Sequence, residues 1–246
     1  MVKQRHLENA PIVEALVDIR VKLPEHIDVT ALRQIHALIS GDYPKEQKSI
    51  RSNIKFEVGK SSPEAPTQDT CPYGYRYTST DGKQIMQARL DGFTFSRLTS
   101  YESWEKLREE AYRLWQLYAK VTTPELITRV ALRYINRLKI PLSLKNFNEY
   151  ITAPPFVPGS LPQGLASFLT RVVVPIPDSR VTAIITQALE PVITDTTSVI
   201  LDIDVFDECL FNADGVEAWE SIENLREVKN KFFFESITEE MAKICE

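Results

Sequence analysis

The sequence predicts an α+β protein: one large antiparallel sheet with helices packed mainly on one face. Three observations lead to this expectation. Apolar and polar residues alternate over 11–22 and 125–140, as they do in half-buried antiparallel strands. Apolar residues recur at helical spacing over 101–120 and 214–234. Strand patterns separated by turn signals occupy much of the remaining chain.

Composition limits the class of protein. The chain has 246 residues, of which 43% are hydrophobic and 26% charged, so it is large enough for one sizeable domain. Its net charge of -5 disfavours non-specific coating of nucleic acid, which is usually a task of basic proteins. The three cysteines are far apart and odd in number, as in reduced intracellular proteins. We find no apolar run of membrane-spanning length and no secretory signal pattern, and therefore expect a cytoplasmic protein without a membrane partner.

The first half opens with a strand and a helix. The alternation over 11–22 predicts the strand, and Pro24 ends it. Asp28 is placed to cap a helix whose apolar residues recur at helical spacing. Gly41 and Pro44 then stop that helix.

A series of strands follows and a long helix closes the half. The Asp-Gly pairs at 81–82 and 91–92 predict hairpin turns, because Gly adopts positive φ without a steric penalty. Prolines and small polar residues predict a loop over 59–72. Ser100 is the expected cap of the helix over 101–120. The expected strands cover residues 48–58, 73–79, 83–90 and 93–98.

The second half repeats this order with one strand fewer. Its longest strand covers 125–140 and ends at Pro141. A loop rich in Pro and Gly is expected at 153–164, and Thr238 is placed to cap a short closing helix. The other expected elements are a short helix at 145–151, strands at 168–176, 181–189 and 198–206, and a helix at 214–234.

The repeated order predicts an internal duplication of a β-α-β(3–4)-α unit. Residues 1–122 and 123–246 would be the halves, sharing one sheet in one compact domain. Landmarks recur at an offset of about 116 residues, as a duplication would leave them. They are Ala15-Leu16 with Ala131-Leu132, Pro24 with Pro141, and Trp104-Glu105 with Trp219-Glu220. The alternative is coincidence between two ordinary α+β halves. The order resembles the half-repeat of TATA-binding-protein-like folds, and this resemblance implies no DNA binding.

Several segments resemble a sporadically distributed, largely uncharacterised family of prokaryotic proteins. The segments that carry the resemblance are NAPIVEA at 9–15, DGFTFSRL at 91–98 and LRYINR at 132–137. The resemblance covers essentially the whole chain but supplies no catalytic residue. The scattered distribution of the family implies an accessory role, such as neutralising a toxin or regulating a defence system.

Signals of catalysis are poor in this sequence. The three histidines, His6, His26 and His36, stand outside any metal-ligand spacing. A zinc-protease motif, a Cys-x-x-Cys pair, a phosphate-binding Gly-rich loop and a nucleophile elbow are all absent. We therefore predict no catalytic residue, cofactor or metal, and leave open whether the protein is an enzyme.

The best constellation is a row of arginines on the long strand. Arg129, Arg133 and Arg137 recur at a spacing of four, so their side chains point the same way from a regular strand. Arginine is suited to bidentate contacts with phosphate or carboxylate. The alternative is a solvated sheet face neutralised by acidic neighbours. The candidate binding residues are Arg129, Arg133, Arg137, Asn136 and Arg97, and weak candidates for a metal site are Asp202 and Asp204.

Three functions remain open. The leading hypothesis is a non-enzymatic regulatory protein that binds a partner protein through the open sheet face or its loops. The second is binding of nucleic acid or a nucleotide through the arginines. The third is a metal-dependent phosphate-processing enzyme, in which the arginines hold phosphates and Asp202 with Asp204 holds the metal. A self-neutralised face favours the first and a free positive concavity favours the second. Homo-oligomer formation also stays open.

Overall fold

The computed structural model is an α+β protein with a large open antiparallel sheet. It describes residues 2–55, 67–99, 101–141, 146–191 and 196–246, within which ten strands and four α-helices are assigned. The sheet runs in the order β2-β3-β4-β5-β1-β6-β9-β8-β7, and the short β10 pairs with β6. None of the described helices is long and apolar enough to cross a membrane.

The elements of both halves follow the expected order closely. The first half contains β1 (Ile12–Lys22), α1 (Val29–Ile39), β2 (Lys45–Lys55), β3 (Thr67–Thr78), β4 (Gln84–Arg89), β5 (Gly92–Leu98) and α2 (Trp104–Thr122). The second contains β6 (Leu126–Pro141), the 3-10 turn η1 (Phe147–Glu149), β7 (Leu169–Pro175), β8 (Val181–Leu189), β9 (Thr196–Asp207), β10 (Phe211–Asn212), α3 (Val216–Ser236) and α4 (Glu239–Ile244).

The sheet is arranged alike on both sides of its centre. The first strands of the two halves, β1 and β6, pair antiparallel over most of their length. On the outer side of β1 lies β5, and on the outer side of β6 lies β9. From there the order runs back through β4, β3 and β2 on one side, and through β8 and β7 on the other.

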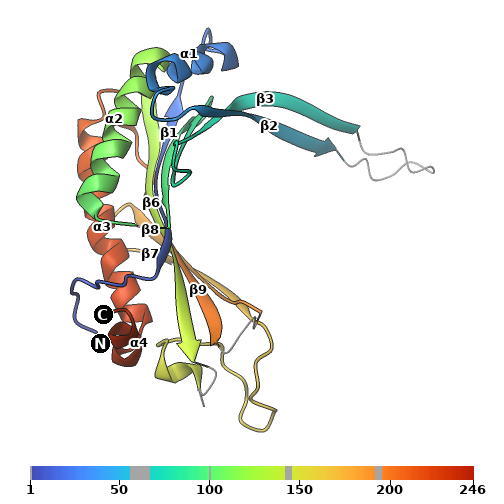
Figure 1. Cartoon of the computed structure of the whole chain (residues 1–246), viewed down its shortest axis with the longest axis vertical. Helices are drawn as coiled ribbons and strands as arrows, with labels where there is room; N and C mark the ends of the chain where they lie inside the picture. The colour runs from blue at the N-terminus through green and yellow to red at the C-terminus, as the bar shows by residue number, and fades with distance from the viewer. Residues whose placement is uncertain (1, 56–66, 100, 142–145, 192–195) are drawn as a thin grey trace.

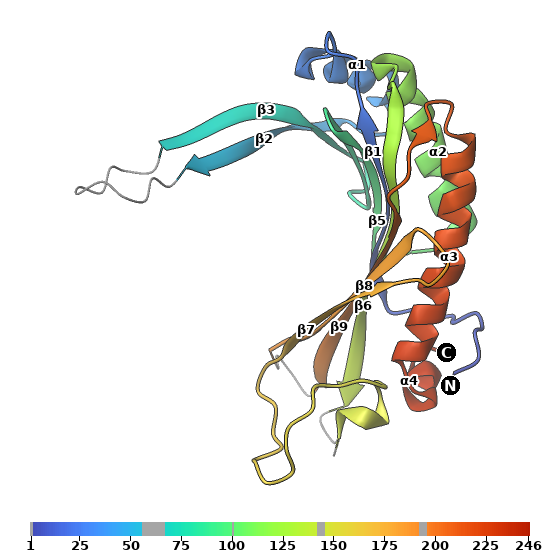
Figure 2. The same cartoon turned by 180° about the vertical axis from the view of Figure 1, so that it is seen from behind.

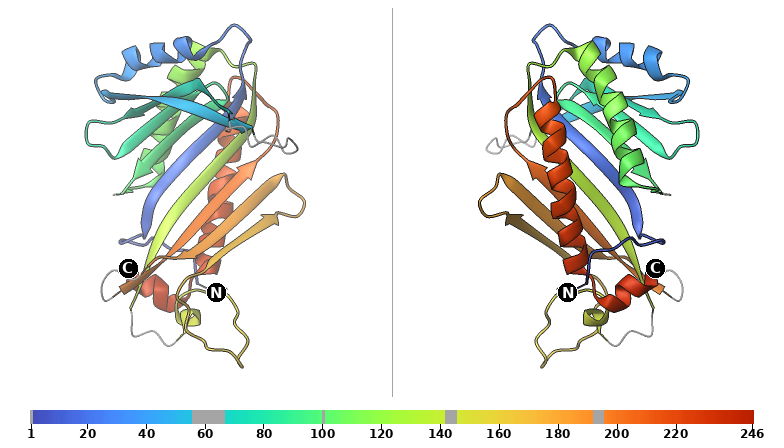
Figure 3. Two further views of the ribbon diagram at one scale, coloured as in Figure 1. Left: turned by 90° about the vertical axis from the view of Figure 1, so that its right-hand side faces the viewer. Right: turned by 90° about the vertical axis from the view of Figure 1, so that its left-hand side faces the viewer.

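One face of the sheet is covered by long helices. Both α2 and α3 run along this face, with α2 over the first half and α3 over β6 and β9 (Figure 3). The alternation of β1 places Ala15, Val17 and Ile19 on the helix side, where each is fully buried. Trp115 of α2 and Leu225 of α3 are fully buried against the same core. The sequence periodicities therefore translate directly into one hydrophobic layer between sheet and helices.

The other face of the sheet is open and concave. Figures 1 and 2 show the sheet curving away from α2 and α3, with β2 and β3 reaching outward as a long hairpin at one end. The irregular segment between η1 and β7 projects at the opposite end of the same side. The open face is thus flanked by two projections, and no helix of the described chain lies over it.

The loop expected over 59–72 is wrong for its second part. Residues 67–72 belong to β3, while 56–66 lie outside the described residues. Pro72 suggested a loop because proline cannot donate a hydrogen bond to a regular ladder. The pairing of β2 with β3 shifts register between Ser49 and Ile50, and Pro72 is accommodated at this bulge.

Other local expectations differ in detail. The β4–β5 hairpin is present, but its turn residues are Leu90 and Asp91, and Gly92 already pairs with Arg89. Gly92 is needed because a Cβ there would lie 2.3 Å from the carbonyl oxygen of Ile19 in β1. The cap of α2 is Ser103, whose side chain accepts from the Lys106 amide, and Ser100 lies outside the described residues. The short helix expected at 145–151 is the 3-10 turn η1, and the sequence gave no signal for the short β10.

Candidate functional site

The five candidate binding residues separate onto the two faces of the sheet. Arg129, Arg133 and Arg137 lie on the open face of β6. Asn136 is 1% exposed and lies on the helix side, because neighbouring residues of a strand point to opposite faces. Arg97 also lies on the helix side, since it pairs in register with Ala15, and it contacts Glu102 at 3.0 Å. The structure therefore brings together three of the five.

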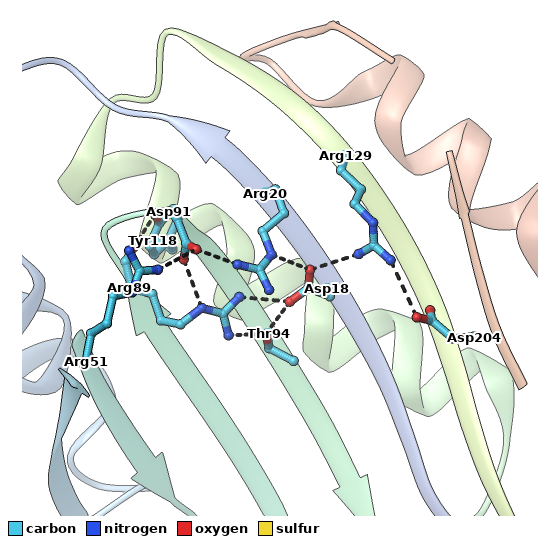
Figure 4. A network of polar contacts seen from close by, with 9 residues as sticks. All are labelled: Asp18, Arg20, Arg51, Arg89, Asp91, Thr94, Tyr118, Arg129 and Asp204. Carbon is cyan, nitrogen blue, oxygen red and sulfur yellow. Dashed lines mark hydrogen bonds and ion pairs between the residues drawn. The ribbon is translucent and has the colours of Figure 1, made fainter. Parts of the chain in front are cut away.

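The centre of the open face is a buried carboxylate, Asp18 of β1. Its oxygens accept hydrogen bonds from Thr94 at 2.6 Å and Arg89 at 2.8 Å. They also accept from Arg20 at 2.9 Å and Arg129 at 3.3 Å (Figure 4). Asp18 and Arg89 are each only 8% exposed, because the surrounding side chains cover them. Four strands thus meet through one carboxylate.

The two carboxylates near Arg129 have opposite pKa shifts. Burial raises the pKa of Asp18, but Arg89, Arg20 and the Thr94 hydroxyl outweigh this effect, and the pKa lies below its usual value. Burial also raises the pKa of Asp204, and there Arg129 and Arg133 offset it only in part, so the pKa lies above its usual value. Asp18 is therefore a fixed anionic centre for the arginines around it.

Asp91 forms a second node beside the first. Its carboxylate lies 2.5 Å from Arg20, 3.2 Å from Arg89 and 3.4 Å from Arg51. Arg51 comes from β2 and places its guanidinium 3.8 Å from the centre of the Tyr73 ring. This node therefore ties the projecting hairpin to the centre of the open face (Figure 4).

The outer arginines also hold carboxylates. Arg133 makes a bidentate contact with Asp202, at 2.8 and 2.6 Å. This pairing was expected from the alternation of the two strands. Arg137 instead contacts Glu190, at 2.9 Å, a residue that the sequence did not indicate because it follows the end of β8.

The two aspartates of β9 are engaged by different arginines. Asp202 is held by Arg133, and Asp204 lies 3.5 Å from Arg129. In the part of the chain that the structure describes, no group of three His, Cys, Asp or Glu residues is placed to hold a metal ion. These contacts give the metal-dependent hypothesis no support from the geometry.

Apolar side chains lie among the ion pairs. A shallow cavity of about 350 Å³ on the open face is lined by Leu16 and Ala131 together with members of the charged network. Arg129 places its guanidinium 4.4 Å from the centre of the Phe206 ring. Ile135, Ile184 and Ile200 are partly exposed on the same face by strand register. The face is therefore a mixture of compensated charge and half-exposed apolar surface.

Two arginines of this face are not compensated. Arg76 of β3 and Arg171 of β7 lie on it by register and are exposed. Among the described residues neither has an ion pair. They stand near opposite ends of the sheet, away from the network around Asp18.

No protein-family model matches this chain, and no curated protein matches it significantly. The family resemblance of segments such as 132–137 therefore stays a prediction. The functional argument rests on the fold and on the side chains described above.

Proposed function

We propose that this chain is a non-enzymatic interaction protein that binds a partner protein on the open, concave face of its sheet. The observation that carries this proposal is the pairing of the central arginines with carboxylates of the same face. Because Arg129, Arg133 and Arg137 are already compensated, an anionic ligand would have to compete with acids held beside them. A partner protein has no such requirement.

The composition of the face fits a protein partner. Protein interfaces combine a partly apolar centre with arginine and aromatic residues, and few uncompensated charges. Here Leu16, Ile135 and Phe206 supply half-exposed apolar surface, while the arginines between them keep hydrogen-bonding capacity. A partner with a convex apolar patch and a polar rim would fill the concavity. An accessory role, such as neutralising a toxin or regulating a defence system, is the biological setting we propose.

The internal duplication belongs to this proposal. The matching strand order on both sides of the β1–β6 pair supports an origin of residues 1–122 and 123–246 from one β-α-β(3–4)-α unit. In that case the open face is composite, since β1 with β5 and β6 with β9 contribute equivalent strips. Superposition of β1, β5 and α2 on β6, β9 and α3 tests this. A match of strand directions with a mismatch in helix position would contradict the duplication.

The docking proposal is tested by substitution on the open face. The full chain is purified with its partner from the native host, as wild type and as Ile135→Arg. A matched control is Leu38→Arg, which alters an exposed apolar residue of α1 away from this face. We expect one stoichiometric partner with the wild type and with Leu38→Arg, and its loss with Ile135→Arg at an unchanged melting midpoint. Retention of the partner by Ile135→Arg would contradict the proposal.

Nucleic-acid or nucleotide binding is the second candidate, favoured by the uncompensated Arg76 and Arg171. It is tested with a labelled oligonucleotide and with nucleotides at low and moderate salt. Phosphate contacts weaken steeply as salt rises. Binding at low salt that is lost in Arg76→Ala and Arg171→Ala would favour this candidate over the first. We expect no saturable binding.

A further inference from the structure

A separate cavity lies on the helix side of the sheet. It has a volume of about 460 Å³ and is enclosed by residues 5–12, the segment leading into α2, β6 and the second half of α3. The N-terminal segment is fastened at both ends of this wall. The Asn9 amide donates to the Cys245 carbonyl at 2.9 Å, and the Arg137 amide donates to the Pro11 carbonyl at 2.8 Å. The cavity is therefore built by segments from both ends of the chain.

A lysine without a counter-charge lies in the wall of this cavity. Lys229 of α3 is 8% exposed, and its ammonium group stands 3.8 Å from the centre of the Tyr134 ring. Its one described hydrogen bond goes to the Asn230 side chain at 2.5 Å. Among the described residues no carboxylate lies within ion-pair distance of it. Burying an ammonium without an anion is costly, so this position calls for an explanation beyond packing.

The neighbours of Lys229 add further hydrogen-bond donors. The hydroxyl groups of Tyr134 and Tyr101 lie 2.9 Å apart and share one hydrogen bond. Arg226 stands one helical turn before Lys229 and also lines the cavity. The nearest carboxylate to its guanidinium is that of Glu227, at 4.0 Å. Two cations and two phenols therefore face one enclosed space.

The acids of the same cavity are engaged elsewhere. Glu102 lies against Arg97 and Lys106 at the entrance to α2. Glu105 accepts hydrogen bonds from Ser103 and from its own backbone amide, and these contacts lower its pKa. Neither compensates Lys229. Glu8 of the N-terminal segment completes the acidic lining and has no ion pair among the described residues.

We propose that this cavity binds a small organic carboxylate with an aromatic or apolar body. The carboxylate would accept hydrogen bonds from Lys229 Nζ and Arg226, and the body would pack against Tyr101 and Phe233. The volume is in the range of small-molecule sites, about 300–1,000 Å³. Such an anion supplies the counter-charge that the protein does not. This site lies across the sheet from the open face and does not depend on the partner-binding proposal.

Calorimetric titration of the full-length protein with benzoate tests the site, with benzamide as the neutral analogue. We expect saturable 1:1 binding of benzoate, and binding of benzamide at least about tenfold weaker, a difference of roughly 1.4 kcal/mol. The Lys229→Met variant, which removes the charge but keeps the length, is expected to weaken benzoate binding by a similar factor. The matched control is Lys231→Met, two residues along the same helix and exposed, which should bind as the wild type does.

Three outcomes would overturn the assignment. The first is the absence of saturable benzoate binding up to about 20 mM, a concentration that still detects very weak complexes. The second is equal affinity of the wild type and Lys229→Met for benzoate. The third is tighter binding of phenyl phosphate than of benzoate, which would contradict the choice of a carboxylate. A melting curve of Lys229→Met recorded alongside shows that any loss of binding occurs in a folded protein.

Discussion

Replacement of Lys229 by methionine should stabilise the protein at neutral and acidic pH. Burial, with a smaller contribution from Arg226, lowers the pKa of Lys229 from 10.5 to about 7. The unfolded chain therefore binds a proton at this site over a pH range in which the folded chain does not. In that range the free energy of unfolding rises with pH, by about 1.4 kcal/mol per unit for one group. The cost of the buried charge is complete below about pH 7 and disappears above the ordinary pKa of lysine.

The expected size of the effect follows from these limits. Below pH 7, Lys229→Met should be more stable than the wild type by a few kcal/mol. The lost contact with the Tyr134 ring reduces the gain by about 0.5–2 kcal/mol. Between pH 6 and pH 9 the difference between the two proteins should shrink by roughly 2–3 kcal/mol.

Urea denaturation at pH 6, 7.5 and 9 measures this difference. Comparison with the variant cancels the titration of groups that both proteins share. Lys231→Met serves as the control and should show no dependence of this kind, because its side chain is exposed. A constant difference across the three pH values, or a Lys229→Met variant less stable at pH 6, would refute the reasoning.

Two further predictions concern the sheet. Asp18→Asn should destabilise the protein by about 3–5 kcal/mol, because it leaves the buried Arg89 without its closest carboxylate. A loss below about 1 kcal/mol in urea denaturation would show that Asp91 compensates alone. Gly92→Ala should cost about 1–3 kcal/mol, since its Cβ would meet the backbone of β1 at 2.3 Å. The control Gly159→Ala has no atom within 4 Å of its Cβ and should leave the melting midpoint unchanged, and equal effects of the two substitutions would contradict the close approach.

The sequence predicted the open face where strand geometry alone decides it. A period of two places Arg129, Arg133 and Arg137 on one side of β6 whatever the strand pairs with. The partner of Arg133 was predictable for the same reason, because Asp202 alternates in phase on another strand. Glu190 was not predictable, since its position depends on where β8 ends relative to β6, which tertiary packing sets.

The cavity on the helix side was missed although a signal was present. The apolar stripe of α3 contains Trp219, Ile222 and Leu225, and its next position at helical spacing is Lys229. A lysine in phase with a buried stripe was a visible irregularity. The stripe was also misplaced at its start, because Val216 is 61% exposed and Ala218 is the buried residue there. The missing counter-charge, by contrast, follows only from the side chains that pack around the ammonium in three dimensions.

Both sites use the same stretch of β6. Residues 132–137, the most specific part of the family resemblance, supply Arg133 and Arg137 to the open face and Tyr134 and Asn136 to the cavity. Alternation along a strand makes this possible, because adjacent side chains leave opposite faces of the sheet. The strand pairs with β1 on one side and β9 on the other, so neither site can shift its β6 residues without disturbing two ladders. A short, distinctive segment in the middle of a sheet is therefore what two back-to-back sites on one strand would require.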